Sequence, residues 1–163
     1  GCLDRDVWRA TEPHAPSPER RLQTVAALTQ AGVSCGVLVA PVLPGISDGP
    51  AQLDRLVAAS VKAGAQSIAC VALHLRPGVR EHYMGWLRTA HPDLLTDHLQ
   101  RYRTAYLPDD ERRGLSAQIQ ELAARHRRQA NMAGALPTTP RWRRHDPARV
   151  MPEPDRDEQL RLM

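Results

Sequence analysis

The chain has 163 residues and a formal net charge of +4 at pH 7, from 22 Lys and Arg against 18 Asp and Glu, a length that suits one domain with or without a tail. No segment is strongly basic, so the charge pattern of a nucleic-acid-binding protein is absent, and no apolar run approaches the ~20 residues of a membrane helix. Three widely spaced cysteines, Cys2, Cys35 and Cys70, fit a reducing cytoplasm better than a disulfide scaffold. The first six residues lack the layout of a signal peptide, and we expect the chain to be part of a longer one.

Two short apolar runs are framed by the same pair of signals. Ala-Gly precedes each run, at residues 31–32 and 63–64, and Pro-Gly follows each, at residues 44–45 and 77–78. The runs, residues 33–42 and 67–75, are continuous rather than alternating, which is typical of strands that are covered on both faces. They predict two parallel strands.

A helical pattern comes before each Ala-Gly. Ser17, Pro18 and Glu19 predict an N-cap, a proline at the first helical position and an acid in the first turn, and Gly32 predicts the helix end. The second helix should begin near residues 47–48 and end at Gly64. Its buried stripe should consist of Leu53, Leu56, Val57 and Val61.

Beyond the second run the pattern becomes helical. Helices are predicted over residues 80–89 and 94–106, and a third begins at Asp109, where acids favour the helix dipole. The third helix should end at the basic residues 125–128. Its buried side should consist of Leu115, Ile119, Leu122 and Ala123. Because prolines recur from residue 134 on, we expect residues 134–163 to be a largely unstructured Pro/Arg-rich tail.

These elements predict an α/β fold with parallel strands. Two βα units and the remainder of an earlier strand at Gly1–Leu3 suggest a partial parallel (β/α) barrel over residues 1–90, with a helical extension over residues 91–133. So small a sheet would leave apolar strand edges unpaired. We therefore expect further strands, a partner or self-association to complete it.

Functional side chains are expected at the carboxyl ends of the strands, where parallel α/β folds place their chemistry. This rule selects Asp4, the segment 40–41, and the pair His74 and Arg76, which share one side of a strand because they are two residues apart. Such a pair could bind a carboxylate or phosphate, or move a proton. Alternatively, the histidine packs at the rim and the arginine pairs with an acid from a helix.

Three further patterns carry weaker signals. Glu12 lies in a loop from which its carboxylate could reach the strand ends or remain solvated. Cys70 and His74 would be ~13 Å apart along a strand, too far to share one zinc ion. Trp142, among arginines, could stack on a nucleobase or belong to a solvated tail.

Four segments together resemble the radical SAM enzymes, and among them the spore photoproduct lyase-like proteins. Residues 3–8 (LDRDVW) resemble the polar turn after the fourth strand, and residues 12–22 (EPHAPSPERRL) resemble an E-P-x-x-P-x-P-x-x-R-L segment. Residues 36–48 (GVLVAPVLPGISD) are similar to the fifth strand and its loop. Residues 73–80 (LHLRPGVR) are similar to the sixth strand of an actinobacterial branch. The resemblance covers residues 1–126.

This resemblance implies the C-terminal half of a (β/α)6 barrel. The complete enzyme would reductively cleave S-adenosylmethionine at a [4Fe–4S] cluster and use the resulting radical on a substrate, with nucleic acid as one candidate. It further implies cofactor contacts from Asp4, Val39, Ala40, Pro41, His74 and Arg76. The loop acid Glu12 is a candidate for binding substrate.

The family's C-x-x-x-C-x-x-C cluster motif has no counterpart in this sequence, and the three cysteines fall in three different segments. We therefore expect the ligands of the cluster, and the N-terminal half of the barrel, to come from outside this chain. Two other interpretations stay open. One is a non-catalytic scaffold that completes a barrel with a partner or a second copy. The other is an aldolase- or epimerase-type half barrel, against which the single lysine, Lys62, weighs because it lies at a helix end.

Overall fold

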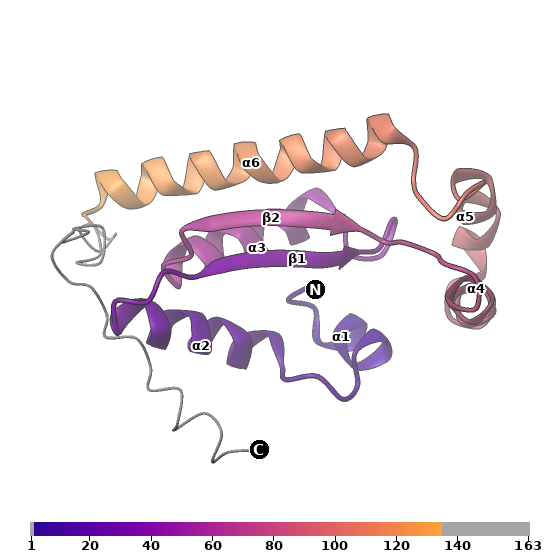
Figure 1. Cartoon of the computed structure of the whole chain (residues 1–163), viewed down its shortest axis with the longest axis horizontal. Coiled ribbons are helices and arrows are strands. Elements are labelled where there is room, and N and C mark those ends of the chain that lie inside the picture. The colour runs from indigo at the N-terminus through magenta and orange to yellow at the C-terminus, as the bar shows by residue number, and fades with distance from the viewer. Residues whose placement is uncertain (1, 135–163) are drawn as a thin grey trace, which may run out of the picture.

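The computed structural model describes residues 2–134, and within them the chain is mixed α/β and mostly helical (Figure 1). Six α-helices and one 3₁₀ turn surround two strands. In chain order these are α1 (Arg5–Thr11), α2 (Pro18–Gln30), β1 (Gly36–Val42), α3 (Pro50–Lys62), β2 (Ser67–Ala72), α4 (Val79–Ala90), η1 (Pro92–Leu94), α5 (Leu95–Arg101) and α6 (Asp109–Met132). The expected tail at residues 134–163 lies outside the described residues, apart from Gly134.

The two predicted strands are present and pair in parallel. Their register runs from Gly36 opposite Ser67 to Val39 opposite Cys70, and becomes irregular before Val42 meets Ala72. The irregularity includes Pro41, which has no N–H to donate to the ladder. These two strands form the whole sheet of the described residues, and the strand expected at residues 1–3 is not seen at Cys2 or Leu3, which lead directly into α1.

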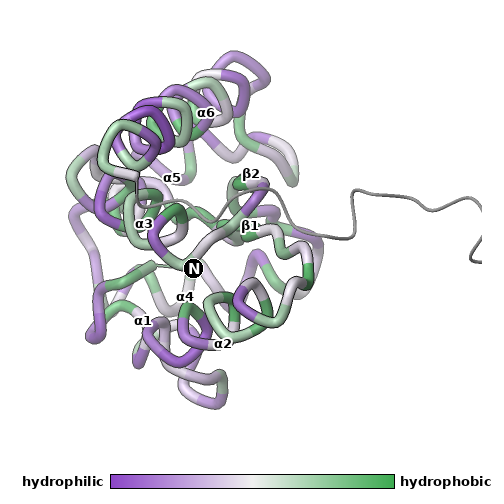
Figure 2. The backbone as a smooth tube through the Cα atoms, turned by 90° about the vertical axis from the view of Figure 1, so that its left-hand side faces the viewer, coloured by the Kyte–Doolittle hydropathy of each residue, from purple (hydrophilic) through white to green (hydrophobic). Residues whose placement is uncertain are grey.

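One face of the sheet is covered by helices. Figures 1 and 2 show α3 and α6 on the same side of the strand pair. The predicted stripe of α3 is buried there, together with Ile119, Leu122 and Ala123 of α6 and with Val39 and Ile68 of the strands. Gln120 of α6 also donates to the carbonyl oxygen of Ile68, at 2.9 Å. The helical extension therefore packs into the same core as the βα units.

The opposite face of the sheet is largely exposed in the described part of the chain. Leu38 of β1 is 61% exposed and Val71 of β2 is 48% exposed, and Ala69 between them is exposed as well. Parallel sheets are normally covered on both faces. This apolar, uncovered surface is the most unusual feature of the fold.

A second core lies beyond the carboxyl ends of the strands. It joins the loop after β1, the segment after β2, and helices α4 and α5. Its buried members are Leu43, Ile46, Leu73, Leu75, Tyr83, Met84, Leu87, Tyr102 and Leu107.

Some predicted helix boundaries are confirmed and others are shifted. The helix predicted to begin near residues 47–48 begins at Pro50. Ser17 caps α2, since its Oγ accepts from the N–H of Arg20. Helix α6 continues beyond the arginines to Met132. The helix predicted to reach residue 106 ends instead at Arg101. The chain turns there because Tyr102 is fully buried and its hydroxyl donates to the carbonyl oxygen of Leu73, at 3.1 Å.

The two predicted glycine helix ends adopt the left-handed conformation, with φ of +85° at Gly32 and +88° at Gly64. They differ in their surroundings. A Cβ on Gly32 would meet nothing within 4 Å, whereas one on Gly64 would lie 2.7 Å from Cγ2 of Thr29. The hydroxyl of that threonine also donates to the carbonyl oxygen of Ala63, at 3.2 Å.

Alanine substitutions at Gly32 and Gly64 can be compared directly, because both glycines have the same left-handed backbone but only Gly64 lies against Thr29. Gly32→Ala should lower the free energy of unfolding by about 1 kcal/mol, through the left-handed conformation alone. Gly64→Ala should cost about 2–3 kcal/mol, because it adds a steric clash in a packed contact. Urea denaturation measures both, and equal losses would contradict the role given to Thr29.

Candidate functional site

A cavity of about 240 Å³ lies at the carboxyl ends of the strands, between α1 and α4. Pro41 and Leu43 line it from the end of β1, and Leu73 lines it from the segment after β2. Val7 of α1 and Trp86 of α4 form facing walls, and the exposed His82 marks the opening. The cavity thus lies where parallel α/β folds hold their ligands.

The wall formed by α1 depends on two acids that the sequence analysis selected. Asp4 is the N-cap of α1, and its Oδ1 accepts from the N–H groups of Asp6 and Val7 at 2.9 and 3.0 Å. Glu12 ends the helix and lines the cavity. Its carboxylate pairs with Arg21 of α2 at 2.5 Å.

The ionisation of Glu12 is set by two opposing effects. Partial burial raises the pKa of its carboxyl group, but the hydrogen bonds and positive charges of Arg21 and of the N-terminal amine together outweigh burial, so the pKa lies below its ordinary value. Glu12 is therefore a carboxylate at neutral pH. It places a carboxylate paired with Arg21 at the cavity, whose other polar lining residues include Ser47 and His82.

The three residues of β1 that the resemblance gives as cofactor contacts differ in their exposure. Val39 is 2% exposed and packs in the core beneath the helices, so its side chain is not available to a ligand. Ala40 is half-buried, and its peptide bond to Pro41 is cis. Pro41 is exposed and lines the cavity.

Leu73, directly after β2, lines the cavity, but His74 and Arg76 do not. The ring of His74 stacks on that of Tyr106, with centroids 3.9 Å apart, and neither ring lines the cavity. Arg76 is exposed in the turn before α4, and its carbonyl oxygen accepts from the N–H of Arg80. Of the seven residues selected from the sequence, Glu12 and Pro41 are brought together at the cavity and the other five are not among its lining residues.

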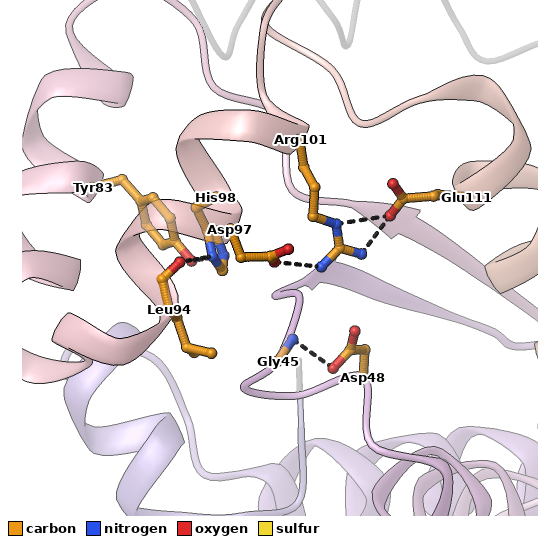
Figure 3. A network of polar contacts seen from close by, with 8 residues as sticks. All are labelled: Gly45, Asp48, Tyr83, Leu94, Asp97, His98, Arg101 and Glu111. Carbon is orange, nitrogen blue, oxygen red and sulfur yellow. Dashed lines mark hydrogen bonds and ion pairs between the residues drawn. The ribbon is translucent and has the colours of Figure 1, made fainter.

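The wall formed by α4 was not predicted as part of a site. Tyr83 and Trp86 line the cavity with their ring centroids 5.6 Å apart. Behind them, Nε2 of His98 lies 3.2 Å from the Tyr83 hydroxyl and Nδ1 lies 3.0 Å from the carbonyl oxygen of Leu94 (Figure 3). The three-residue spacing of Tyr83 and Trp86 was the available signal, since it places both rings on one helix face.

The cysteines do not form a cluster site. Cys2 lines the cavity, but it is buried and its thiol donates to the carbonyl oxygen of Asp4. Burial raises the pKa of both Cys2 and Cys70, which disfavours the thiolate form that ligates iron. Among residues 2–134, no three His, Cys, Asp or Glu side chains are grouped so as to hold a metal ion. A [4Fe–4S] cluster therefore does not fit the described residues.

Comparisons with known proteins give relatives but no family. Three mycobacterial proteins are 36% identical to this chain over 137 residues: the uncharacterized proteins Rv2578c and MT2655 of Mycobacterium tuberculosis, and Mb2609c of Mycobacterium bovis. The match covers 83% of this chain but only 40% of each relative. No family model and no solved structure matches. Within the described residues, none of the helices has the length and apolar character needed to cross a membrane.

The Glu12–Arg21 pair gives a pH-dependent prediction. Because the folded-state pKa of Glu12 is lowered, its ion pair stabilises the fold above the ordinary carboxyl pKa, and this contribution is lost as the pH falls through the folded-state value. Glu12→Gln should therefore lower the free energy of unfolding by about 1 kcal/mol near neutral pH. The difference from wild type should vanish in acid.

Urea denaturation over a pH series measures this difference, and Glu121→Gln on the exposed side of α6 is the control. A Glu12→Gln deficit that persists at low pH would show that the side chain acts through packing and not through its charge.

Proposed function

We propose that this chain is the C-terminal part of a radical SAM enzyme, and that its strands complete a partial barrel with strands from the N-terminal part of a longer protein. The observation that carries the proposal is the sheet itself. It has two parallel strands, helices on one face and an exposed apolar surface on the other. In a barrel that inner face is covered by the facing strands.

The β1 edge that faces away from β2, at residues 36–39, is where we propose that such a strand would lie. A groove of about 210 Å³ lies between this edge and α2, and is lined by Leu22 and Val25 of α2 and by residues 36–39 of β1. In a βα unit the helix that precedes a strand packs across that strand and the one before it. The groove has the apolar character that a further parallel strand requires.

The comparisons support a longer protein. The chain spans about 40% of the length of the mycobacterial relatives it matches, which leaves room in a protein of that length for the barrel strands and cluster ligands that this chain lacks. The three cysteines here are free, which supports a reducing cytoplasmic location.

S-adenosylmethionine would be held at the carboxyl edge of the sheet. Of the three proposed contacts from β1, Pro41 is exposed and Ala40 is half-buried, whereas Val39 is buried. Asp4, His74 and Arg76 remain proposed contacts, although Asp4 caps α1 and His74 stacks on Tyr106. Glu12 is proposed to bind substrate, for which nucleic acid remains a candidate.

The exposed sheet face also favours a second candidate, a scaffold that associates with a separate half barrel or with a second copy but performs no chemistry. Unpaired apolar strand edges associate readily with other strands. The two functions differ in whether a complete barrel binds a cluster.

Anaerobic reconstitution with iron and sulfide distinguishes them. This chain alone should bind no stoichiometric cluster and form no 5′-deoxyadenosine with dithionite and S-adenosylmethionine, because its thiols are dispersed. The full-length Mycobacterium tuberculosis relative Rv2578c should do both, as judged by iron–sulfur absorbance and product analysis.

A version of Rv2578c cut to the region that matches this chain is the matched control. A full-length relative without a cluster would reject the enzyme proposal, and stable pairing of the two halves in that case would favour the scaffold.

A further inference from the structure

The size and lining of the cavity between α1 and α4 restrict the ligands it can take. Its volume of about 240 Å³ exceeds the roughly 150 Å³ that accommodates benzene in an apolar protein cavity. It falls short of the roughly 300–1,000 Å³ typical of sites for drug-sized ligands. A single planar ring system of one or two rings matches this volume.

The walls favour an aromatic ligand over an aliphatic one. Trp86 and Tyr83 both line the cavity, with an interplanar angle of 44°, so a ring placed between α1 and α4 meets two aromatic surfaces. Aromatic pairs at such distances gain attraction beyond the area they bury. Val7, Leu43 and Leu73 add apolar contacts. The Glu12 carboxylate, which also lines the cavity, is already paired with Arg21.

The position of Tyr83 is fixed from behind the cavity wall. A carbonyl oxygen only accepts hydrogen bonds, so Nδ1 of His98 donates to Leu94, and its Nε2 is left to accept from the Tyr83 hydroxyl. Burial raises the pKa of Tyr83, which keeps the hydroxyl protonated as a donor. His98 is fully buried, so no water competes for this hydrogen bond.

Helix α5, which carries His98, also leads to a contact with Leu73 in the cavity wall. The ring of Tyr102, one helical turn from His98 at the end of α5, stacks near it with centroids 5.9 Å apart. The Tyr102 hydroxyl donates to the carbonyl oxygen of Leu73, and Leu73 lines the cavity. Helix α5 therefore links Tyr83 and Leu73, two parts of the cavity wall that come from different elements.

We propose that this cavity is a binding site for an uncharged planar aromatic ring, and that His98 is its positioning residue, acting through the Tyr83 hydroxyl. The site is formed by this chain's own residues. It therefore does not depend on the proposed radical chemistry.

The test is titration of the full chain with indole, followed by amide NMR shifts and calorimetry. Shifts should concentrate on α1, α4 and residues 41–43, and indole should bind about fivefold tighter than hexanol, which has similar hydrophobicity but no ring. Absence of indole binding, equal affinity for hexanol, or shifts elsewhere would overturn the site.

Substitutions at His98 separate its two hydrogen bonds. His98→Gln places an acceptor for the Tyr83 hydroxyl where Nε2 lies, and it should keep indole affinity within about twofold of wild type. His98→Asn keeps the donor to the Leu94 carbonyl oxygen but loses the acceptor for Tyr83. His98→Asn and Tyr83→Phe should each weaken indole binding about fivefold. The double variant should weaken it no further, because both remove the same hydrogen bond.

Urea denaturation of every variant confirms that it is folded under the titration conditions. Full indole affinity in folded His98→Asn would remove the positioning role. So would additive losses in the double variant, since they would mean that the two residues act separately.

Discussion

A parallel strand pair can form only if the chain crosses over between the strands and the crossover helix packs on the sheet. Here α3 is that crossover, but a helix of 13 residues covers only part of the face. The rest is covered by α6, which begins 37 residues after β2 ends and contributes Ile119, Leu122 and Ala123 to the same core. The covered face of the sheet is therefore completed by a helix that lies far along the chain.

Polar contacts join the C-terminal helices to one another, in addition to the apolar core that they share with the strand ends. Arg101 of α5 contacts Glu111 of α6 and Asp97 of its own helix (Figure 3), while Arg80 of α4 donates to the carbonyl oxygen of Tyr102 at 2.6 Å. Partly exposed ion pairs such as these contribute little to stability individually. The buried hydrogen bonds of His98 and Tyr102 matter more, because a buried group that loses its partner pays the full cost of desolvation.

The fold was predictable from the sequence where a pattern had one physical meaning. The continuous apolar runs gave β1 and β2, and the Ser17 cap and the stripe of α3 gave those helices. Helix α1 was missed because seven residues are too few for a helical period to show. Asp4 illustrates the ambiguity: an acid after an apolar residue is typical of a strand end, yet the same carboxylate is a good helix N-cap.

The site was only partly predictable, for a related reason. Strand-end position correctly indicated the region of the cavity, and Pro41 lines it. Strand alternation beyond residue 72 did not hold, because β2 ends there and the following segment pairs with the turn before α6, where Leu75 donates to the carbonyl oxygen of Ala105 at 2.8 Å. That tertiary pairing turns His74 toward Tyr106, and no local pattern in the sequence encodes it.

The chain thus combines an incomplete sheet with a cavity whose walls it supplies itself. In the proposed function the exposed face of Leu38 and Val71 is covered by other strands, whereas the cavity is bounded by α1, α4 and the strand ends, and Tyr83 in its wall is held by His98 of α5. The sheet face and the cavity would therefore bind different kinds of molecule. A partner that adds strands along β1 would bury apolar area and stabilise the fold, but the choice of ring in the cavity would still be set by Tyr83 and Trp86. Assembly and ligand selectivity are in this way assigned to different residues of one short chain.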